Sequence, residues 1–366
     1  MTAKNVLDFK VPFLPGWGDF NFFHCFASAY VFAEGLDISG IADYPCPPRN
    51  NGLPCHGCGN VRKGKCEHAM LNKVSPYAFM FDAMSGRSSL RLRYDGEPTE
   101  MQKLVGSIGY IADFLFGFAG YEYRKCADGG AFRDEIAASI DAGKPVIAET
   151  KRGAGRDGCF HVITGYDGDA LACPTGDYFY QRERPEGPPA YGDLAALYIF
   201  GSKTAPRYTL KDGLNNIRKA VEYTVSEKLW DGYLVKMGGW DAFPSDDGLD
   251  NADMDEKKKR MERMLYTIRF SMNAHFVDKA FQDIHIRHEE MRDPKLAGYW
   301  KEIRANSIYI GHGIENKIAG INWDTVNPAA FRGISKAVCE GIVKNKAADL
   351  KLLDALGQAI GVLEKK

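Results

Sequence analysis

The 366-residue chain has 45% hydrophobic and 26% charged residues and a formal net charge of -1. This is the composition of a globular protein, and the length is sufficient for two domains. Lysine and arginine residues are scattered rather than gathered in a basic stripe or tail, so we expect no nucleic-acid partner. No segment approaches the roughly 20 apolar residues of a membrane span, and Met1 to Phe22 lacks the apolar core of a signal peptide. We therefore expect a soluble, cytoplasmic protein without a membrane partner.

Apolar residues at helical spacing predict a buried helix that begins near Cys25 and runs to Leu36. Residues 43–68 then lose all periodicity and fill with proline, glycine, asparagine and cysteine, which predicts a loop or a small insert. Tyr77 to Phe81 is short and apolar, and we expect a short strand there. The first third of the chain is therefore predicted to hold a buried helix, a cysteine-rich insert and one strand.

Thr99 and Gln102 form a capping-box pattern at the start of an apolar segment that extends to Phe118. Residues 131–142 are amphipathic with helical spacing, and Gly143 follows directly, as glycine commonly does where a helix ends. These patterns predict helices on both sides of residue 120.

Four apolar segments with strand-like composition follow the amphipathic helix, at residues 144–149, 160–166, 170–173 and 194–200. Asp167 and Gly168 provide hairpin turn chemistry between the second and the third of them. From about Tyr208 onward the strand patterns end and helical patterns continue. We predict an α+β domain over residues 1–205, with a cysteine-rich insert at 43–68, followed by an all-α helical domain over residues 206–366.

Cys25 and His161 are our candidates for a nucleophile and a general base. A thiol attacks as its thiolate, and either a helix N-terminus or a neighbouring imidazolium lowers its pKa. Cys25 is expected at the start of a helix, and His161 at the start of a strand that would hold the imidazole rigidly. Asp177 follows the hairpin at Gly168 and is our first choice for orienting that ring, with Asp169 as the alternative. The competing interpretation is that both residues are ordinary members of a packed core.

The order of these segments resembles that of the papain-like cysteine peptidases. The segments are a helix carrying His24-Cys25, the run Gly143-Lys144-Pro145-Val146-Ile147-Ala148, and the strand Phe160-His161-Val162-Ile163-Thr164-Gly165-Tyr166-Asp167. Within this fold the chain is similar to the bacteriocin-leader-processing peptidases. The closer resemblance is to the family of the N-terminal domain of butirosin biosynthesis protein H, which couples such a domain to a helical one. That family includes an acyltransferase that moves an aminoacyl group from a carrier-protein thioester to an amine.

The resemblance implies a papain-like fold with an antiparallel sheet and a cysteine-dependent acyl transfer. Cys25 would accept the acyl group, His161 would act as the general base, and the Cys25 backbone N–H would form part of the oxyanion hole. The reaction would be that of an aminoacyl or acyl transferase, or of an amide or thioester hydrolase. The expected partner is a small-molecule or peptide acyl substrate, with a carrier protein as a further option.

The sequence departs from the papain-like pattern at two positions. Asp19 stands six residues before the nucleophile, where such enzymes commonly place a glutamine that donates to the oxyanion, so Asn21 becomes our candidate donor. Cys173 stands where many relatives carry an aspartate. These departures motivate a second hypothesis, a catalytically inactive papain-like binding or scaffold protein.

Cys46, Cys55, Cys58 and Cys66 follow each other with the spacing C-x8-C-x2-C-x7-C in a loop rich in glycine and proline. Four thiolates in so short a segment can complete a tetrahedral zinc site, which would stabilise a loop with little core of its own. We expect structural zinc here. An iron–sulfur cluster, disulfides or free thiols are the alternatives. A third functional hypothesis is a metal-binding sensor centred on this cluster.

Overall fold

The computed structural model of the chain describes residues 4–11, 20–39, 74–90, 99–151, 160–174, 188–234, 293–312 and 325–365. These residues divide between two compact units. The described residues of the first unit are 4–11, 20–39, 74–82, 106–151, 160–174 and 188–209, and those of the second are 83–90, 99–105, 210–234, 293–312 and 325–365. Each unit is described by itself.

The first unit contains two antiparallel sheets. Its strands are β1 (Lys4–Val6), β2 (Tyr121–Cys126), β3 (Val146–Thr150), β4 (Phe160–Ile163), β5 (Gly165–Asp167), β6 (Ala170–Ala172) and β7 (Leu194–Lys203). The larger sheet has the order β2-β7-β3-β4 and the smaller sheet the order β1-β5-β6, and all of these neighbours pair antiparallel. The predicted α+β class is confirmed. In this order β4 is an edge strand of the larger sheet.

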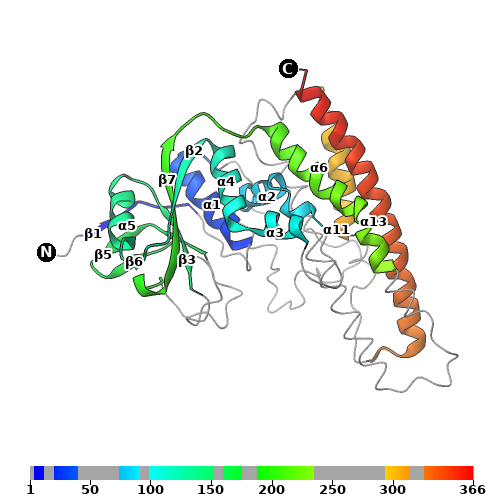
Figure 1. Cartoon of the computed structure of the whole chain (residues 1–366), viewed down its shortest axis with the longest axis horizontal. Helices are drawn as coiled ribbons and strands as arrows, with labels where there is room; N and C mark the ends of the chain where they lie inside the picture. The colour runs from blue at the N-terminus through cyan, green and yellow to red at the C-terminus, as the bar shows by residue number, and fades with distance from the viewer. Residues whose placement is uncertain are drawn as a thin grey trace. The chain divides into compact units, whose positions relative to one another are not determined.

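Helices cover both faces of the larger sheet, as Figure 1 shows. The helices of this unit are α1 (Phe20–Ala33), most of α2 (Ser75–Met84), α4 (Ile108–Ala119) and α5 (Phe132–Asp141). On one face, the Phe22 ring of α1 meets Tyr198 of β7 edge-on at 5.1 Å, and the Phe116 ring of α4 meets Phe200 at 4.7 Å. On the other face, Ile136 of α5 belongs to the same core cluster as the inward side chains of β3 and β7. The two faces thus have separate hydrophobic cores.

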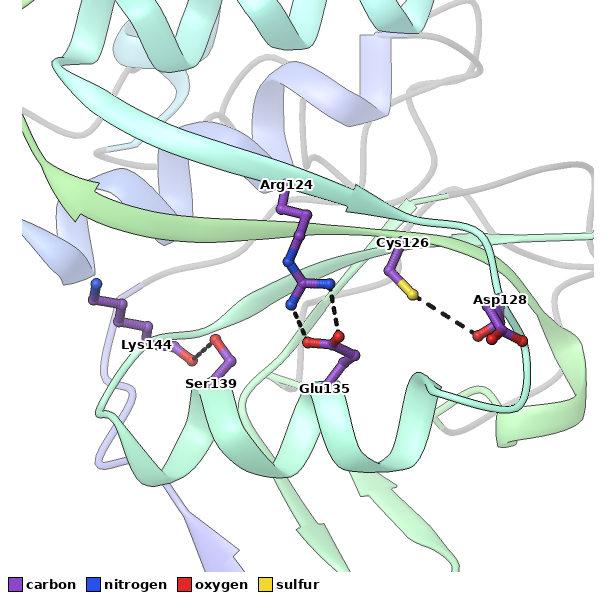
Figure 2. A network of polar contacts seen from close by, with 6 residues as sticks. All are labelled: Arg124, Cys126, Asp128, Glu135, Ser139 and Lys144. Atoms are coloured by element: carbon purple, nitrogen blue, oxygen red, sulfur yellow. Dashed lines mark hydrogen bonds and ion pairs between the residues drawn. The ribbon is translucent and has the colours of Figure 1, made fainter.

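Polar contacts fasten α5 to the strands beside it (Figure 2). The Arg124 guanidinium of β2 forms a two-pronged ion pair with Glu135, in which Nη1 donates to Oε1 at 2.6 Å. At the other end of α5, the Ser139 hydroxyl donates to the Lys144 carbonyl at 3.1 Å. Gly143 has φ 79, a left-handed conformation that glycine adopts without steric cost and that turns the chain into β3. The helix predicted over 131–142, with Gly143 at its end, is confirmed.

The segment predicted as one strand over 160–166 is divided between the two sheets. The division lies at Thr164, whose N–H donates to the Ala172 carbonyl and whose carbonyl accepts from the Leu7 N–H, both at 2.8 Å. Gly165 then passes so close to β1 that a Cβ atom would lie 2.7 Å from the Asn5 carbonyl oxygen, so a side chain cannot be accommodated. The predicted hairpin is confirmed, because β5 and β6 pair across a turn that contains Gly168 with φ 59.

The strand predicted for Tyr77 to Phe81 is wrong, since these residues lie within helix α2. A short apolar run does not by itself distinguish a buried strand from a buried helix. Pro76 sits at the second residue of the helix, where a missing N–H costs no hydrogen bond and the fixed φ suits a helix. Tyr77 and Phe81 are one turn apart and both are buried, which a helix allows.

The second unit is helical in its described part. Its helices are α3 (Glu100–Gly106, its last residue in the first unit), α6 (Leu210–Ser226), α11 (Ala297–His312) and α13 (Pro328–Leu363), with a short 3-10 helix at Arg87–Ser89. The predicted capping box is confirmed, because the Gln102 Oε1 accepts from the Thr99 N–H at 2.8 Å and the Gln102 N–H donates back to the Thr99 hydroxyl at 3.3 Å. The apolar segment that follows is interrupted at Ser107, where α4 starts.

Three helices of the second unit, α6, α11 and α13, lie side by side (Figure 1). A buried polar contact joins α13 to the helical residues that follow α6, where the Trp230 indole Nε1 donates to the Asp349 carboxylate at 2.5 Å. Beyond β7, the described residues form helices and no strands, as the sequence patterns predict. None of the helices described here has the length and apolar character needed to cross a membrane.

Candidate active site

Helix α1, which carries Cys25, is buried on all sides. Every residue from Asn21 to Val31 is buried, and Cys25 itself is 0% exposed. A helix that is apolar around its whole circumference belongs inside a core rather than on a surface. The three polar side chains in this stretch, Asn21, His24 and Ser28, therefore stand out, because burying a polar group costs free energy unless it is hydrogen-bonded.

The helix begins at Phe20, five residues before Cys25, so the prediction that it begins near Cys25 is wrong. Residues 20–24 contain no glycine or proline, and Phe22 and Phe23 extend the apolar run, so the helix starts a full turn earlier. Cys25 lies in the second turn of α1. There each backbone N–H donates a hydrogen bond to the carbonyl four residues earlier, which for Cys25 is the Asn21 carbonyl. The Cys25 N–H is consequently not an oxyanion donor, and the helix dipole acts weakly at this depth.

The structure places α1 directly against the strand of His161. The Asn21 side-chain Oδ1 accepts a hydrogen bond from the Phe160 backbone N–H at 2.6 Å, and the Phe22 ring meets the Phe160 ring edge-on at 5.0 Å. Asn21 and Cys25 are one helical turn apart and lie on the same side of α1. The elements that carry the two candidate catalytic residues are therefore neighbours, although they are far apart in the sequence.

The amide of Asn21 has a defined orientation. Because the Phe160 N–H is a donor, the Asn21 atom that meets it must be the oxygen, which assigns the other position to Nδ2. Nδ2 is buried and has no hydrogen-bond partner among the described residues. A buried N–H donor that is held in place and left unused is what an oxyanion site requires.

His161 is 8% exposed and pairs with Ala148 across the ladder of β3 and β4. Side chains alternate between the faces of a strand, so His161 projects from the face opposite Phe160, on which α1 packs. The structure thus brings the helix and the strand together and places His161 on the far side of the edge strand. Contact between the imidazole and Cys25 would have to be made around β4, which is an edge strand of the sheet among the described residues.

His24 neighbours Cys25 in the sequence but has different chemistry. It is fully buried, and burial lowers the pKa of its imidazole to about 3. A ring with this pKa stays neutral near pH 7 and cannot form an imidazolium that stabilises a thiolate. His24 is therefore unsuited to the role that we assign to His161.

The remaining predicted site residues fall into two groups. Asp19, Asp177 and the four cysteines of the cluster, Cys46, Cys55, Cys58 and Cys66, lie outside the described residues. Asp169 is described, and its carboxylate forms an ion pair with Arg133 at the exposed tip of the β5–β6 hairpin. That hairpin belongs to the smaller sheet, so Asp169 is poorly placed to orient His161. Within the described ranges, no group of three or more His, Cys, Asp or Glu side chains could hold a metal ion.

Sequence reasoning missed Glu149 and Tyr198, which form a polar pair on the face of the sheet that α1 covers. Tyr198 is 0% exposed, and its hydroxyl donates to the Glu149 Oε2 at 3.1 Å. Burial and the nearby Glu149 carboxylate raise the pKa of Tyr198 above the ordinary tyrosine value, so its hydroxyl keeps its proton. The signal in the sequence was a glutamate that directly follows the apolar residues Val146, Ile147 and Ala148 in β3.

No protein-family model and no curated protein matches the chain. The residues of α1 and β4 and their arrangement therefore provide the clues to function. That arrangement combines a buried thiol, an oriented amide donor one turn away, and a histidine that follows directly after the residue bonded to that amide. A thiol, a donor and an imidazole are the groups that acyl transfer through a thioester requires.

Proposed function

We propose that the protein catalyses cysteine-dependent acyl transfer, as an aminoacyl or acyl transferase or as an amide or thioester hydrolase. The Cys25 thiolate attacks the carbonyl carbon of a thioester or amide, and the Asn21 Nδ2 donates to the oxyanion. The bond to the leaving thiol or amine breaks, and His161 gives that group a proton. An amine or water then attacks the Cys25 thioester while His161 accepts its proton, which releases the acylated product or the free acid and regenerates the Cys25 thiolate beside a protonated His161.

The observation that supports this proposal best is the hydrogen bond between Asn21 and Phe160. It ties the helix of Cys25 to the residue before His161, and it leaves the Asn21 Nδ2 available as a donor on the Cys25 side of α1. The elements that carry Cys25 and His161 are far apart in the sequence, and their packing side by side supports the proposal. We also propose a papain-like relation, which a cysteine helix packed on an antiparallel sheet supports.

A second candidate is a papain-like binding or scaffold protein without catalysis. Two observations favour it: Cys25 is fully covered in this conformation, and it lies in the second turn of α1, where the helix dipole activates a thiol little. Under the first proposal the cover over Cys25 has to open for the substrate. Under the second, Cys25 is a core residue that never reacts.

Trapping of an acyl-enzyme separates these candidates. The purified protein is incubated with a small acyl thioester, S-acetyl-N-acetylcysteamine, and the acetyl group is located by mass spectrometry of peptides. We expect acetylation of Cys25 that is lost in Cys25→Ser and slowed about 100-fold or more in Asn21→Ala, as for the loss of one oxyanion donor. Cys126→Ser, which removes another buried cysteine of the same unit, provides the matched control and should leave the rate unchanged.

Absence of acetyl-Cys25 in wild type, or equal acetylation of Cys25 and Cys126, would refute the acyl-transfer proposal and favour the binding protein. Equal rates in wild type and Asn21→Ala would remove Asn21 from the oxyanion site while leaving Cys25 as the acyl acceptor.

A further inference from the structure

Helix α13 has apolar side chains on two opposite faces. One face packs on α6 and α11 and buries Val338, Leu352 and Leu356, which lie on the same side of the helix. On the other face, Val343 and Leu350 are 55% and 50% exposed and lie two turns apart. The solvent side of a helix in a globular protein is ordinarily polar, so a second apolar face indicates a surface for a partner.

Val343, Ala347 and Leu350 form an exposed apolar row on this second face, which we call the outer stripe. They follow each other at spacings of four and three residues, which puts them on one side of the helix. Four large apolar side chains are exposed in the part of the chain that the structure describes. Two of them belong to the outer stripe, and the others, Val6 and Leu104, lie on β1 and α3. Apolar residues that are exposed singly are common, whereas neighbours on one helix face mark an interaction surface.

Charged side chains flank the outer stripe in an alternating order. Lys336 and Glu340 precede Val343 along the helix, and Lys351 and Asp354 lie toward its other end. All four are exposed, and because successive helical residues are about 100° apart, they lie on the same flank, between about 20° and 80° from Val343. Read along α13, the charges are positive, negative, positive and negative.

This order of charges is complementary to its own reverse. In an antiparallel copy of α13, related by a two-fold axis near residue 345, Lys336 lies opposite Asp354. The same axis places Glu340 opposite Lys351, so opposite charges meet at each of these positions. A parallel copy would instead place each charge beside the identical residue, and like charges would repel. The charges therefore favour an antiparallel pair of this helix.

We propose that the outer stripe of α13 is the interface of a homodimer, in which two copies of this helix pack antiparallel. With the axis near residue 345, Val343 of one copy lies within one turn of Ala347 and Leu350 of the partner subunit. Burial of these side chains drives the association, and the flanking charges set its orientation. The homodimer does not depend on acyl transfer and goes beyond the proposed function.

Sedimentation equilibrium of the full-length protein measures the dissociation constant of the dimer and tests the apolar contact. We expect the wild-type protein to form dimers at about 100 μM or below, and Leu350→Glu to raise the dissociation constant at least about tenfold, because it sets a charge against apolar side chains. Leu104→Glu alters a leucine of nearly equal exposure on α3 and should leave the constant unchanged. Circular dichroism shows that each variant folds. A wild-type protein that stays monomeric at about 100 μM, or equal dissociation constants of the two variants, would overturn the proposal.

Exchange of charges tests the antiparallel orientation. Lys336→Glu and Asp354→Lys each bring like charges together across the interface, and each should raise the dissociation constant about tenfold. In an equal mixture of the two variants, a mixed dimer again has opposite charges at both contacts between positions 336 and 354. We expect the mixture to associate about as tightly as wild type. A mixture that associates no more tightly than either variant alone would overturn the antiparallel homodimer.

Discussion

At the scale of single residues, α1 is unusual because it buries an imidazole next to a thiol. His24 is fully buried, and burial lowers the pKa of its imidazole from 6.5 to about 3. The unfolded chain therefore binds a proton at His24 over a range of pH in which the folded protein does not. This difference couples the stability of the first unit to acidification.

We predict that stability falls as the pH drops from about 6.5 toward 3. A group whose pKa is lower in the folded protein than in the unfolded chain stabilises the fold fully at pH values above its unfolded pKa. As the pH falls toward the folded pKa of His24, this contribution is lost, and the loss in the free energy of unfolding is on the order of a few kcal/mol. His24→Gln removes the titration and should flatten this part of the curve. Urea unfolding at several pH values measures the free energy of unfolding of wild type and of His24→Gln. An identical slope in wild type and His24→Gln would show that His24 does not carry the dependence.

The hydrogen bond of Asn21 provides a second residue-scale prediction. Asn21→Ala leaves the buried Phe160 N–H without its acceptor, and we expect the free energy of unfolding to fall by about 1–3 kcal/mol. Urea denaturation gives this value directly. Asn5→Ala is the matched control, since its amide donates to Asp141 at an exposed position and its loss should cost no more than about 0.5 kcal/mol. Equal effects of the two substitutions would contradict the buried contact.

At the scale of secondary-structure elements, α5 and β2 share a hydrophobic core and are also joined by an ion pair that is partly open to solvent. The hydrogen bonds from Arg124 lower the pKa of Glu135, so Glu135 stabilises the fold above its ordinary carboxyl pKa and loses this contribution as the pH falls through its lower folded value. The Arg124 side chain is 56% exposed, which limits the energy of the pair to about 1 kcal/mol or less.

We predict that Glu135→Gln lowers stability slightly at pH 7 and that the difference from wild type shrinks as the pH falls well below the ordinary carboxyl pKa. Thermal unfolding at both ends of this pH range, in low salt, is the measurement. Asp128→Asn, next to the same strand but outside the ion pair, serves as the control and should not reproduce this pattern. A difference that persists at low pH would indicate lost packing rather than a lost charge.

Elements with strong local signals could be predicted from the sequence. Gly143 and the amphipathic pattern before it defined α5, and Asp167-Gly168 defined the hairpin, because turn chemistry is local. Tyr77 to Phe81 was assigned wrongly, since a short apolar run carries no period that separates a helix from a strand. The start of α1 was misplaced for a related reason, because its apolar run continues on the N-terminal side of Cys25 through Phe22 and Phe23.

The candidate site was predictable in part. Cys25 and His161 were selected by residue type and by the order of segments, and the structure places their elements side by side. The orientation of His161 depends on the register of β4 and on which face α1 covers, and both are tertiary properties. Glu149 and Tyr198 come together only through the pairing of β3 with β7, which no local pattern in either strand encodes.

At the scale of the whole molecule, the chain joins an α+β unit to a helical unit, and the cysteine cluster at residues 46–66 precedes α2. We propose that this cluster holds structural zinc, because four thiolates at this spacing can complete a tetrahedral site. Such a site would stabilise a loop that has few apolar residues of its own.

We predict close to one zinc ion per chain in protein purified without chelators, and a lower thermal stability after its removal. Elemental analysis measures the ratio, and Cys58→Ser should abolish binding whereas Cys339→Ser, on α13, should not. A zinc-to-protein ratio near zero would contradict the proposal, and iron in place of zinc would point to an iron–sulfur cluster.

The central claim, that Cys25 is an activated nucleophile with His161 as its base, is tested most directly by the pH dependence of Cys25 alkylation by iodoacetamide. We expect the wild-type rate to titrate with an apparent pKa below the ordinary thiol value of about 8.5, and His161→Ala to return it to that value. Circular dichroism of the variant confirms that it folds. Titration near 8.5 in wild type, with no change in His161→Ala, would contradict the claim.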